Sequence, residues 1–204
     1  MITIIDYGMG NLGSVLNMYK RIGLPARITS DPGQIKDAEK IILPGVGAFD
    51  AAMDCIHNSG MTTILNQKVK IDKIPTLGIC LGMQLLFEGS EEGIKPGLSW
   101  IKGKAYKFQF TNDSTLKIPH MGWNKIKVVK ESPLIQDLPD HPKFYFVHSY
   151  FVKCHDEGDV LCTTPYGTDF HSIVQHENVY GAQFHPEKSH KFGMKLLENF
   201  ATLC

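Results

Sequence analysis

The sequence has no apolar run long enough to cross a bilayer and no excess of charge of either sign. Lys and Arg together number 21, as do Asp and Glu, so the formal net charge is zero. This balance argues against a broad surface for nucleic acid or for an anionic membrane. Residues 1–6 lack the basic segment of a signal peptide and have the pattern of a strand. We therefore expect a cytoplasmic protein with no membrane or nucleic-acid partner.

Closely spaced cysteines are also missing. The chain has five cysteines, an odd number, and no C-x-x-C pair: Cys55, Cys80, Cys154, Cys162 and Cys204. This usage predicts reduced thiols and argues against a disulfide framework or a zinc ribbon, so no metal site is expected. No linker-like, low-complexity or repeated segment interrupts the 204 residues, which favours a single domain over 1–204.

The first part of the chain alternates strand-like and helix-like patterns. Short apolar segments that predict strands are 2–6, 26–29, 40–43 and 76–79, and helical spacing recurs between them, from 14 to 22 and up to about residue 70. After residue 87 strand-like segments dominate, at 101–108, 124–129, 144–152, 160–163, 172–175 and 179–184, before an amphipathic helix at 189–203. The order predicts an α/β fold with an open, mixed, largely parallel sheet flanked by helices.

A glycine-rich turn follows the first strand. Gly8, Gly10 and Gly13 match the dinucleotide-binding pattern G-x-G-x-x-G, and Asp31 lies about 20 residues further on, where an acid would bind ribose. Taken alone, this segment is compatible with an NAD-binding oxidoreductase. The alternative is a tight turn whose glycines allow close packing. The polar pair at 6–7 weakens the cofactor interpretation, because an apolar strand should run up to the first glycine.

The segment 75–87 has the pattern of a nucleophile elbow. An apolar run ends at Cys80, helical spacing begins directly after it, and Gly78 and Gly82 stand two residues to either side. The turn would be so tight that larger side chains at the two glycines would collide. The following helix would direct its positive end at the sulfur and favour the thiolate. The alternative is a buried structural cysteine at a strand end.

A candidate base follows the last strand. A thiolate nucleophile needs a base, and the base needs a group that orients it, which His185 and Glu187 supply at the carboxyl end of segment 179–184. Zinc deaminases also carry H-x-E, but with a P-C-x-x-C segment that this chain lacks. Of the other histidines, His148 is a candidate for the site and His120 a secondary one, and the rest are expected to be surface or structural residues.

Residues 78–84 together with 185–187 resemble the class I (triad) glutamine amidotransferases, and the resemblance covers essentially the whole chain. Segments 6–11, 44–47, 119–124 and 145–150 resemble the histidine-biosynthesis branch of that family more than the branches for anthranilate or guanylate synthesis. The resemblance implies a flavodoxin-like fold, no cofactor, and a structural role for the N-terminal glycines.

The resemblance also implies roles for single residues. Cys80 would attack the side-chain amide of L-glutamine, His185 would activate the water that hydrolyses the thioester, and Glu187 would orient His185. The oxyanion donors would be the N–H groups of Leu81 and of Val46 or Gly47, on a loop expected to face away from the site without partner and substrate. Contacts to the rest of glutamine are expected from Gly45, Gln84, His148, Ser149 and Tyr150.

The implied partner is a separate (β/α)8 cyclase subunit of imidazole glycerol phosphate synthase, a HisF-like barrel, in a heterodimer. Some members of this branch instead supply ammonia for the amidation of surface sugars, and the sequence leaves both partners open. Met121, Trp123 and Asn124 are the candidate interface residues, because an amphipathic aromatic is a typical anchor. The alternative is that Trp123 is a core residue.

Overall fold

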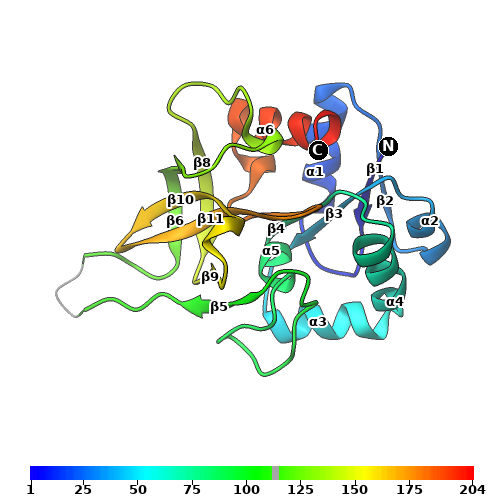
Figure 1. The fold of residues 1–204 in the computed structure, drawn as a ribbon, viewed down its shortest axis with the longest axis horizontal. Helices are drawn as coiled ribbons and strands as arrows, with labels where there is room; N and C mark the ends of the chain where they lie inside the picture. The colour runs from blue at the N-terminus through cyan, green and yellow to red at the C-terminus, as the bar shows by residue number, and fades with distance from the viewer. Residues whose placement is uncertain (112–114) are drawn as a thin grey trace.

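An eight-stranded mixed sheet forms the centre of the computed structural model, which describes residues 1–111 and 115–204 (Figure 1). The strand order is β2-β1-β3-β4-β12-β11-β10-β7. The first five are mutually parallel: β2 (Ala26–Thr29), β1 (Ile2–Ile5), β3 (Lys40–Gly45), β4 (Thr76–Cys80) and β12 (Val179–Ala182). The remaining three, β11 (Thr168–His176), β10 (Val160–Tyr166) and β7 (Lys127–Val128), are antiparallel. The predicted mixed, largely parallel sheet is thereby confirmed.

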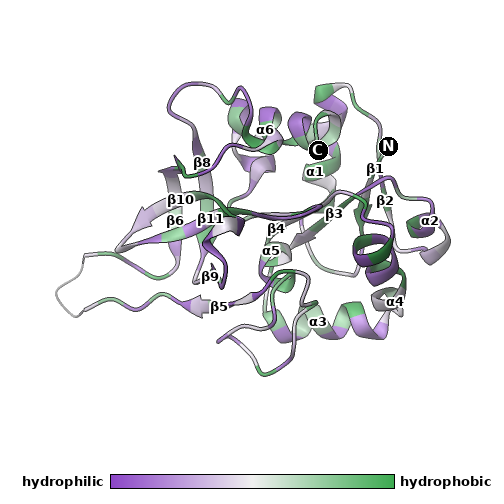
Figure 2. Ribbon diagram, in the orientation of Figure 1, coloured by the Kyte–Doolittle hydropathy of each residue, from purple (hydrophilic) through white to green (hydrophobic). Residues whose placement is uncertain are grey.

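Helices cover both faces of the parallel half. On one face lie α1 (Leu12–Ile22) and α6 (His190–Thr202), and on the other lie α3 (Phe49–Asn58), α4 (Met61–Asn66) and α5 (Leu81–Leu85) (Figure 1). Along β3, Ile42 joins the core under α1 and α6, whereas Ile41 and Leu43 join the core under the other three helices. Successive side chains of a strand point to opposite faces, so one apolar strand serves two cores. Figure 2 shows the matching pattern in α3, where apolar and polar segments alternate.

Two small sheets stand at the antiparallel end. β5 (Gly103–Lys107) pairs with β9 (Tyr150–Cys154), and β6 (His120–Lys125) pairs with β8 (Lys143–His148). The sequence predicted one strand over 144–152, but the structure divides it at Ser149, because β8 and β9 pair with different partners. The division places the 148–150 turn beside the end of β4, where it lines the cavity described below.

Short helical turns complete the chain. A π-helical turn (Gln67–Ile71) continues α4, and 3₁₀ turns lie at Pro133–Ile135, Glu157–Asp159 and Pro186–Lys188. The sequence analysis did not predict α2 (Pro32–Lys36). Asp31 caps this helix, since its Oδ1 accepts the Gly33 N–H at 2.8 Å and Pro32 occupies the first helical position. The acid that could have bound a ribose therefore caps the start of a helix instead.

Within the described residues, no helix combines the length and the apolar character needed to cross a membrane. The five cysteines are all free thiols, and three of them, Cys80, Cys154 and Cys162, are buried.

Candidate active site

Cys80 occupies the predicted elbow between β4 and α5. Its backbone has φ +56° and ψ −112°, a conformation that costs a non-glycine residue energy and that recurs at nucleophiles. A Cβ atom on Gly78 would lie 2.6 Å from the Gly82 carbonyl oxygen, and one on Gly82 would lie 1.8 Å from the Leu43 carbonyl oxygen. Neither position accepts a larger residue, as the sequence analysis predicted.

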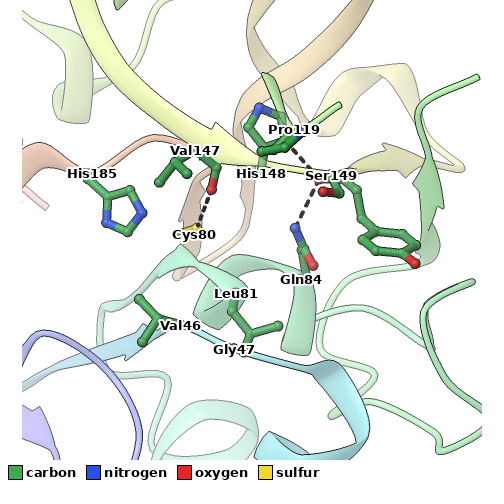
Figure 3. Close-up of a pocket in the computed structure, with 11 residues that line it drawn as sticks. Val46, Gly47, Cys80, Leu81, Gln84, Pro119, Val147, His148, Ser149 and His185 are labelled. Atoms are coloured by element: carbon green, nitrogen blue, oxygen red, sulfur yellow. Dashed lines mark hydrogen bonds between the residues drawn. The ribbon is translucent and has the colours of Figure 1, made fainter. Parts of the chain in front are cut away.

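A cavity of about 330 Å³ opens over the Cys80 sulfur (Figure 3). Two lining residues, Pro119 and Val147, were not predicted. The carbonyl oxygen of Val147 lies 4.0 Å from the Cys80 sulfur. The predicted residues that line the cavity are Val46, Gly47, Cys80, Leu81, Gln84, His148, Ser149, Tyr150 and His185. Segments distant in the sequence thus converge at the carboxyl ends of β3, β4 and β12.

His185 and Glu187 form a buried pair beside Cys80. The His185 Nδ1 lies 2.8 Å from the Glu187 Oε1, and the two side chains are 3% and 2% exposed. The backbone of His185 is fixed as well, because its N–H donates to the Tyr145 carbonyl at 2.9 Å and its carbonyl accepts the Ser189 hydroxyl at 2.6 Å. The ring therefore has little freedom to turn away from the cavity.

The electrostatics of His185 favour its charged form. Burial lowers the pKa of His185, but the nearby Cys80 thiol and the Glu187 carboxylate outweigh it and raise the pKa to about 10. The Nε2 atom is buried, and among the described residues it makes no hydrogen bond of ordinary geometry. Figure 3 shows a ring nitrogen of His185 directed towards Cys80. This nitrogen is thus free to exchange a proton with the sulfur or with a substrate.

His148 faces the same cavity in the opposite charge state. Its Nδ1 lies 2.8 Å from the Tyr150 carbonyl oxygen, and its Nε2 lies 3.0 Å from the Nδ1 of His120. Burial lowers the pKa of His148 to about 3 and that of His120 to about 4. A carbonyl only accepts, so Nδ1 of the neutral His148 carries the hydrogen and Nε2 accepts one from His120. Both ring nitrogens are therefore occupied inside the protein.

Two glutamine side chains extend this network to the nucleophile. The Gln84 Nε2 donates to the Tyr150 carbonyl at 3.0 Å and to the Gln183 Oε1 at 3.2 Å (Figure 3 shows the first contact). Gln183, which the sequence analysis missed, places its own Nε2 3.9 Å from the Cys80 sulfur. An amide two residues before the base, directly after the apolar segment 179–182, was the available signal.

Residues 3–204 match the family model described as "Glutamine amidotransferase class-I". The chain belongs to this family. It is 54% identical to "Imidazole glycerol phosphate synthase subunit HisH 2" of Methanococcus maripaludis, over 98% of both chains. It is 48% identical to the protein of that name from Pseudomonas aeruginosa and 47% identical to "Imidazole glycerol phosphate synthase subunit HisH" of Leptospira borgpetersenii, over 100% of each chain. The predicted family is confirmed.

Solved structures agree on the fold of this amidotransferase. "Structure of PurLQS from Thermotoga maritima" superposes with a TM-score of 0.74 at 17% identity, covering 98% of this chain and 96% of that chain. "Crystal structure of glutamine amidotransferase" superposes with a TM-score of 0.72 at 17% identity, covering 99% and 100%. The similarity at this low identity confirms the predicted amidotransferase fold.

The 44–47 loop of the amidotransferase lies against the N-terminal glycine-rich turn. The Tyr7 hydroxyl donates to the Pro44 carbonyl at 2.7 Å, and a Cβ on Gly10 would lie 3.2 Å from the same oxygen. A Cβ on Gly47, which has φ +104°, would lie 2.7 Å from the Met9 Cε. The glycines of the turn thus serve close packing, and a cofactor role is not needed to explain them.

Gly45 lies behind the cavity and does not line it. It is a buried residue of β3 paired with Cys80, and a Cβ there would lie 2.6 Å from the Gly82 N. Val46 and Gly47, which directly follow Gly45, are exposed and line the cavity. The orientation of this loop stays a prediction.

The candidate interface residues lie on β6, next to the strand that lines the cavity. Met121 is 62% exposed and pairs with Val147, and Trp123 is 43% exposed and stacks on the His190 ring at 5.5 Å. Trp123 is therefore not a core residue. Asn124 differs from both, because its Nδ2 donates to the Pro165 carbonyl at 2.9 Å and lies 3.3 Å from the His120 Nε2.

No metal site accompanies this cavity: the described residues contain no cluster of three or more His, Cys, Asp or Glu suited to a metal.

Proposed function

We propose that this amidotransferase is the glutaminase subunit of imidazole glycerol phosphate synthase. It hydrolyses L-glutamine to glutamate and ammonia, and a cyclase subunit consumes the ammonia in histidine biosynthesis. The observation that carries the proposal is the His185–Glu187 pair, joined at 2.8 Å, beside the sulfur of an elbow cysteine. The full-length relatives named HisH, at 45–54% identity, support the pathway.

The chemistry follows from the two protonation states of His185. The Cys80 thiolate attacks the amide carbon of glutamine, and the His185 imidazolium gives its Nε2 proton to the departing ammonia. The neutral imidazole then takes a proton from water, whose oxygen attacks the glutamyl thioester and releases glutamate and the thiolate. Glu187 keeps the ring in place and stabilises its charged form throughout.

Each tetrahedral intermediate carries a negative oxygen that needs N–H donors. Leu81 N–H, directly after the nucleophile, is one donor, and Val46 or Gly47 N–H is the other. The glutamine backbone would lie along Ser149 and Tyr150, where the Gln84 Oε1 is left to accept from an ammonium group because its Nε2 is already committed. His148 contributes through its main chain, since its ring nitrogens are occupied.

The proposed partner is a (β/α)8-barrel cyclase in a cytoplasmic heterodimer, and residues 1–204 would act as one amidotransferase domain. Ammonia must leave Cys80 without entering bulk water, so the partner should cover the cavity mouth. Met121 and Trp123 are exposed on the strand next to this mouth, which supports docking there. Asn124, which is bound internally, would shape the surface without being its main anchor.

A paralogous role is the second candidate. Two of the relatives carry the printed name "HisH 2", which marks them as numbered subunits. A paralogue would supply ammonia to a sugar-amidating synthase through the same glutaminase chemistry. Purifying the chain from its own cells and identifying the protein that remains bound separates the two: a (β/α)8 cyclase supports the histidine pathway, and a synthase supports the paralogue.

Cys80→Ser tests the division of labour in the purified complex. We expect glutamine-dependent synthesis to be abolished and synthesis from added ammonium salt to stay near the wild-type rate, because the triad only makes ammonia. Cys55→Ser, a partly buried cysteine outside the cavity, is the matched control and should leave both activities unchanged. Failure of ammonium to rescue the Cys80→Ser complex would contradict the proposal.

A further inference from the structure

Gln183 is a buried polar side chain that the mechanism above does not use. It follows β12 directly, and Ala182 of that strand pairs with Ile79, so Gln183 lies beside Cys80 in the parallel register. Its side chain is completely buried, and its Nε2 lies 3.9 Å from the Cys80 sulfur. Burying an amide is costly unless its donors and acceptor are matched, so the surroundings of Gln183 show what each end of the amide contacts.

The main chain fixes the direction of this amide. The Tyr150 carbonyl can only accept, so the Gln84 atom 3.0 Å from it is the NH₂ group. The same NH₂ lies 3.2 Å from the Gln183 amide, whose near atom must then be the oxygen. The NH₂ of Gln183 is thereby turned towards Cys80. Because the series starts at a backbone atom, flipping either amide would place two donors or two acceptors together.

The Tyr150 carbonyl is itself well fixed. It accepts the His148 Nδ1–H at 2.8 Å in addition to Gln84, so both of its lone pairs are used. His148 in turn is held by His120 at 3.0 Å. A carbonyl held in this way gives Gln84, and through it Gln183, a single preferred orientation.

We propose that Gln183 is a further activating residue of the nucleophile: its amide N–H, oriented by Gln84 and the Tyr150 carbonyl, donates to the Cys80 sulfur and stabilises the thiolate. A donor to an ionised group favours the ionised form, whereas a neutral thiol is only a weak acceptor. The same contact holds the sulfur at one position while its bonds to carbon form and break. The importance of this role for glutamine hydrolysis rests on the function proposed above.

Few groups near Cys80 titrate between pH 5 and 9. His185 faces it from the turn after β12, with Glu187 behind, and these two neighbours raise the pKa of His185. Burial, with smaller contributions from Cys55 and Cys80, raises the pKa of Tyr7, which stays neutral. Burial lowers the pKa of His148 on β8, which stays neutral as well. A change at Gln183 should therefore appear directly in the pH dependence of Cys80 alkylation.

The test is the pH dependence of Cys80 alkylation by iodoacetamide in the full chain, measured for the Cys80 peptide by mass spectrometry. Gln183→Met keeps the length of the side chain and removes the donor. We expect the midpoint to rise by about one pH unit, so that alkylation at a pH below the wild-type midpoint slows by roughly ten-fold. Gln84→Met removes the hydrogen bond that orients the Gln183 amide, so it should raise the alkylation midpoint by a smaller amount.

Gln175→Met is the matched control. Gln175 lies on β11 and bonds Ser132, Tyr180 and the Glu177 carbonyl, away from the cavity, so the Cys80 profile should not change. An unchanged midpoint in folded Gln183→Met, with circular dichroism as the check of folding, would overturn the proposal. If Gln183→Met does not fold, an unchanged midpoint in Gln84→Met overturns it equally.

An assay of ammonia release from glutamine distinguishes a failure of this proposal from a failure of the proposed glutaminase function. If the wild-type complex releases no ammonia from glutamine while the alkylation midpoints differ as expected, the glutaminase function is wrong and the role of Gln183 stands. If the complex hydrolyses glutamine and the midpoints coincide, the role of Gln183 is wrong and the function stands. In Gln183→Met, the loss should appear in kcat with little change in KM.

Discussion

His185 and His148 line one cavity and are both buried, yet they have opposite charge states. Each places its Nδ1 2.8 Å from an oxygen acceptor, which is the Glu187 carboxylate in one case and the Tyr150 carbonyl in the other. The pKa of His185 is raised to about 10, whereas that of His148 is lowered to about 3. Burial lowers both values, and only the charge of Glu187 together with the Cys80 thiol reverses the effect.

The comparison separates proton transfer from positioning. His185 can donate and recover a proton, because its charged form is stable and its Nε2 is uncommitted. His148 is neutral and both of its ring nitrogens are bound, so it can only hold the Tyr150 carbonyl and the wall of the cavity in place. Substitutions at the two positions should therefore fail in different ways.

His185→Ala should have the largest effect. Without the group proposed to protonate ammonia and activate water, glutaminase activity of the complex should fall by roughly 10⁴–10⁶-fold in kcat. Ammonia release, coupled to a reporter dehydrogenase, measures the loss. The double variant with Cys80→Ser should lose little more than either single variant, because the two residues act as a unit. Additive losses would place them in separate sites.

Glu187→Gln should lower the pKa of His185 towards that of His148. The substitution keeps the shape of the side chain and replaces a carboxylate with a neutral amide, so the pKa of His185 should fall. We expect kcat to drop by about 10⁴-fold, as in other triads that lose their acid, and the pH–rate profile to change shape. An unchanged profile with nearly full activity would show that the carboxylate does not set the charge of His185.

His148→Gln should have a modest effect of another kind. Glutamine retains a donor for the Tyr150 carbonyl, so we expect an increase in KM of about ten-fold, with kcat and its pH profile little changed. Steady-state kinetics of the complex over pH 6–9 check this. A loss in kcat comparable to that of His185→Ala would contradict the division between proton transfer and positioning.

The smallest effect concerns stability against pH. The folded pKa of His148 lies below its unfolded value of 6.5, so the unfolded state binds more protons and stability falls between about pH 6.5 and pH 3. His185 has the opposite sign: its contribution is full below pH 6.5 and is lost as the pH rises through about 10. The urea midpoint of His148→Gln should therefore fall less than that of the wild type when the pH is lowered from 6.5 to 3. The urea midpoint of Glu187→Gln should fall less than that of the wild type when the pH is raised towards 10.

The elbow at Cys80 and the pairing of His185 with Glu187 were predictable because steric and chemical rules act over a few residues. Gly78 and Gly82 are required by contacts within one turn and the adjacent strand, and His185 and Glu187 share one short segment. The parallel half of the sheet was predictable for the same reason, because each strand-like and helix-like segment is visible in a short stretch of sequence.

The network behind the triad was not predictable from local patterns. The link from His120 through His148 and Gln84 to Gln183 depends on the division of β8 from β9 at Ser149, which pairing with β6 and β5 decides. A strand-like run of residues gives no sign of that division. Asp31 was misleading for a different reason: its spacing suits a ribose, but the local pattern of Pro32 and Gly33 after it makes it a helix cap.

The most direct test is a ¹⁵N NMR measurement of the histidine ring nitrogens at pH 7, in the chain labelled at histidine and assigned with His185→Ala and His148→Gln. The account predicts that both nitrogens of His185 carry hydrogen, and that His148 is neutral with its hydrogen on Nδ1. A neutral His185, or a charged His148, at this pH would contradict the claim that the two buried rings divide proton transfer and positioning between them.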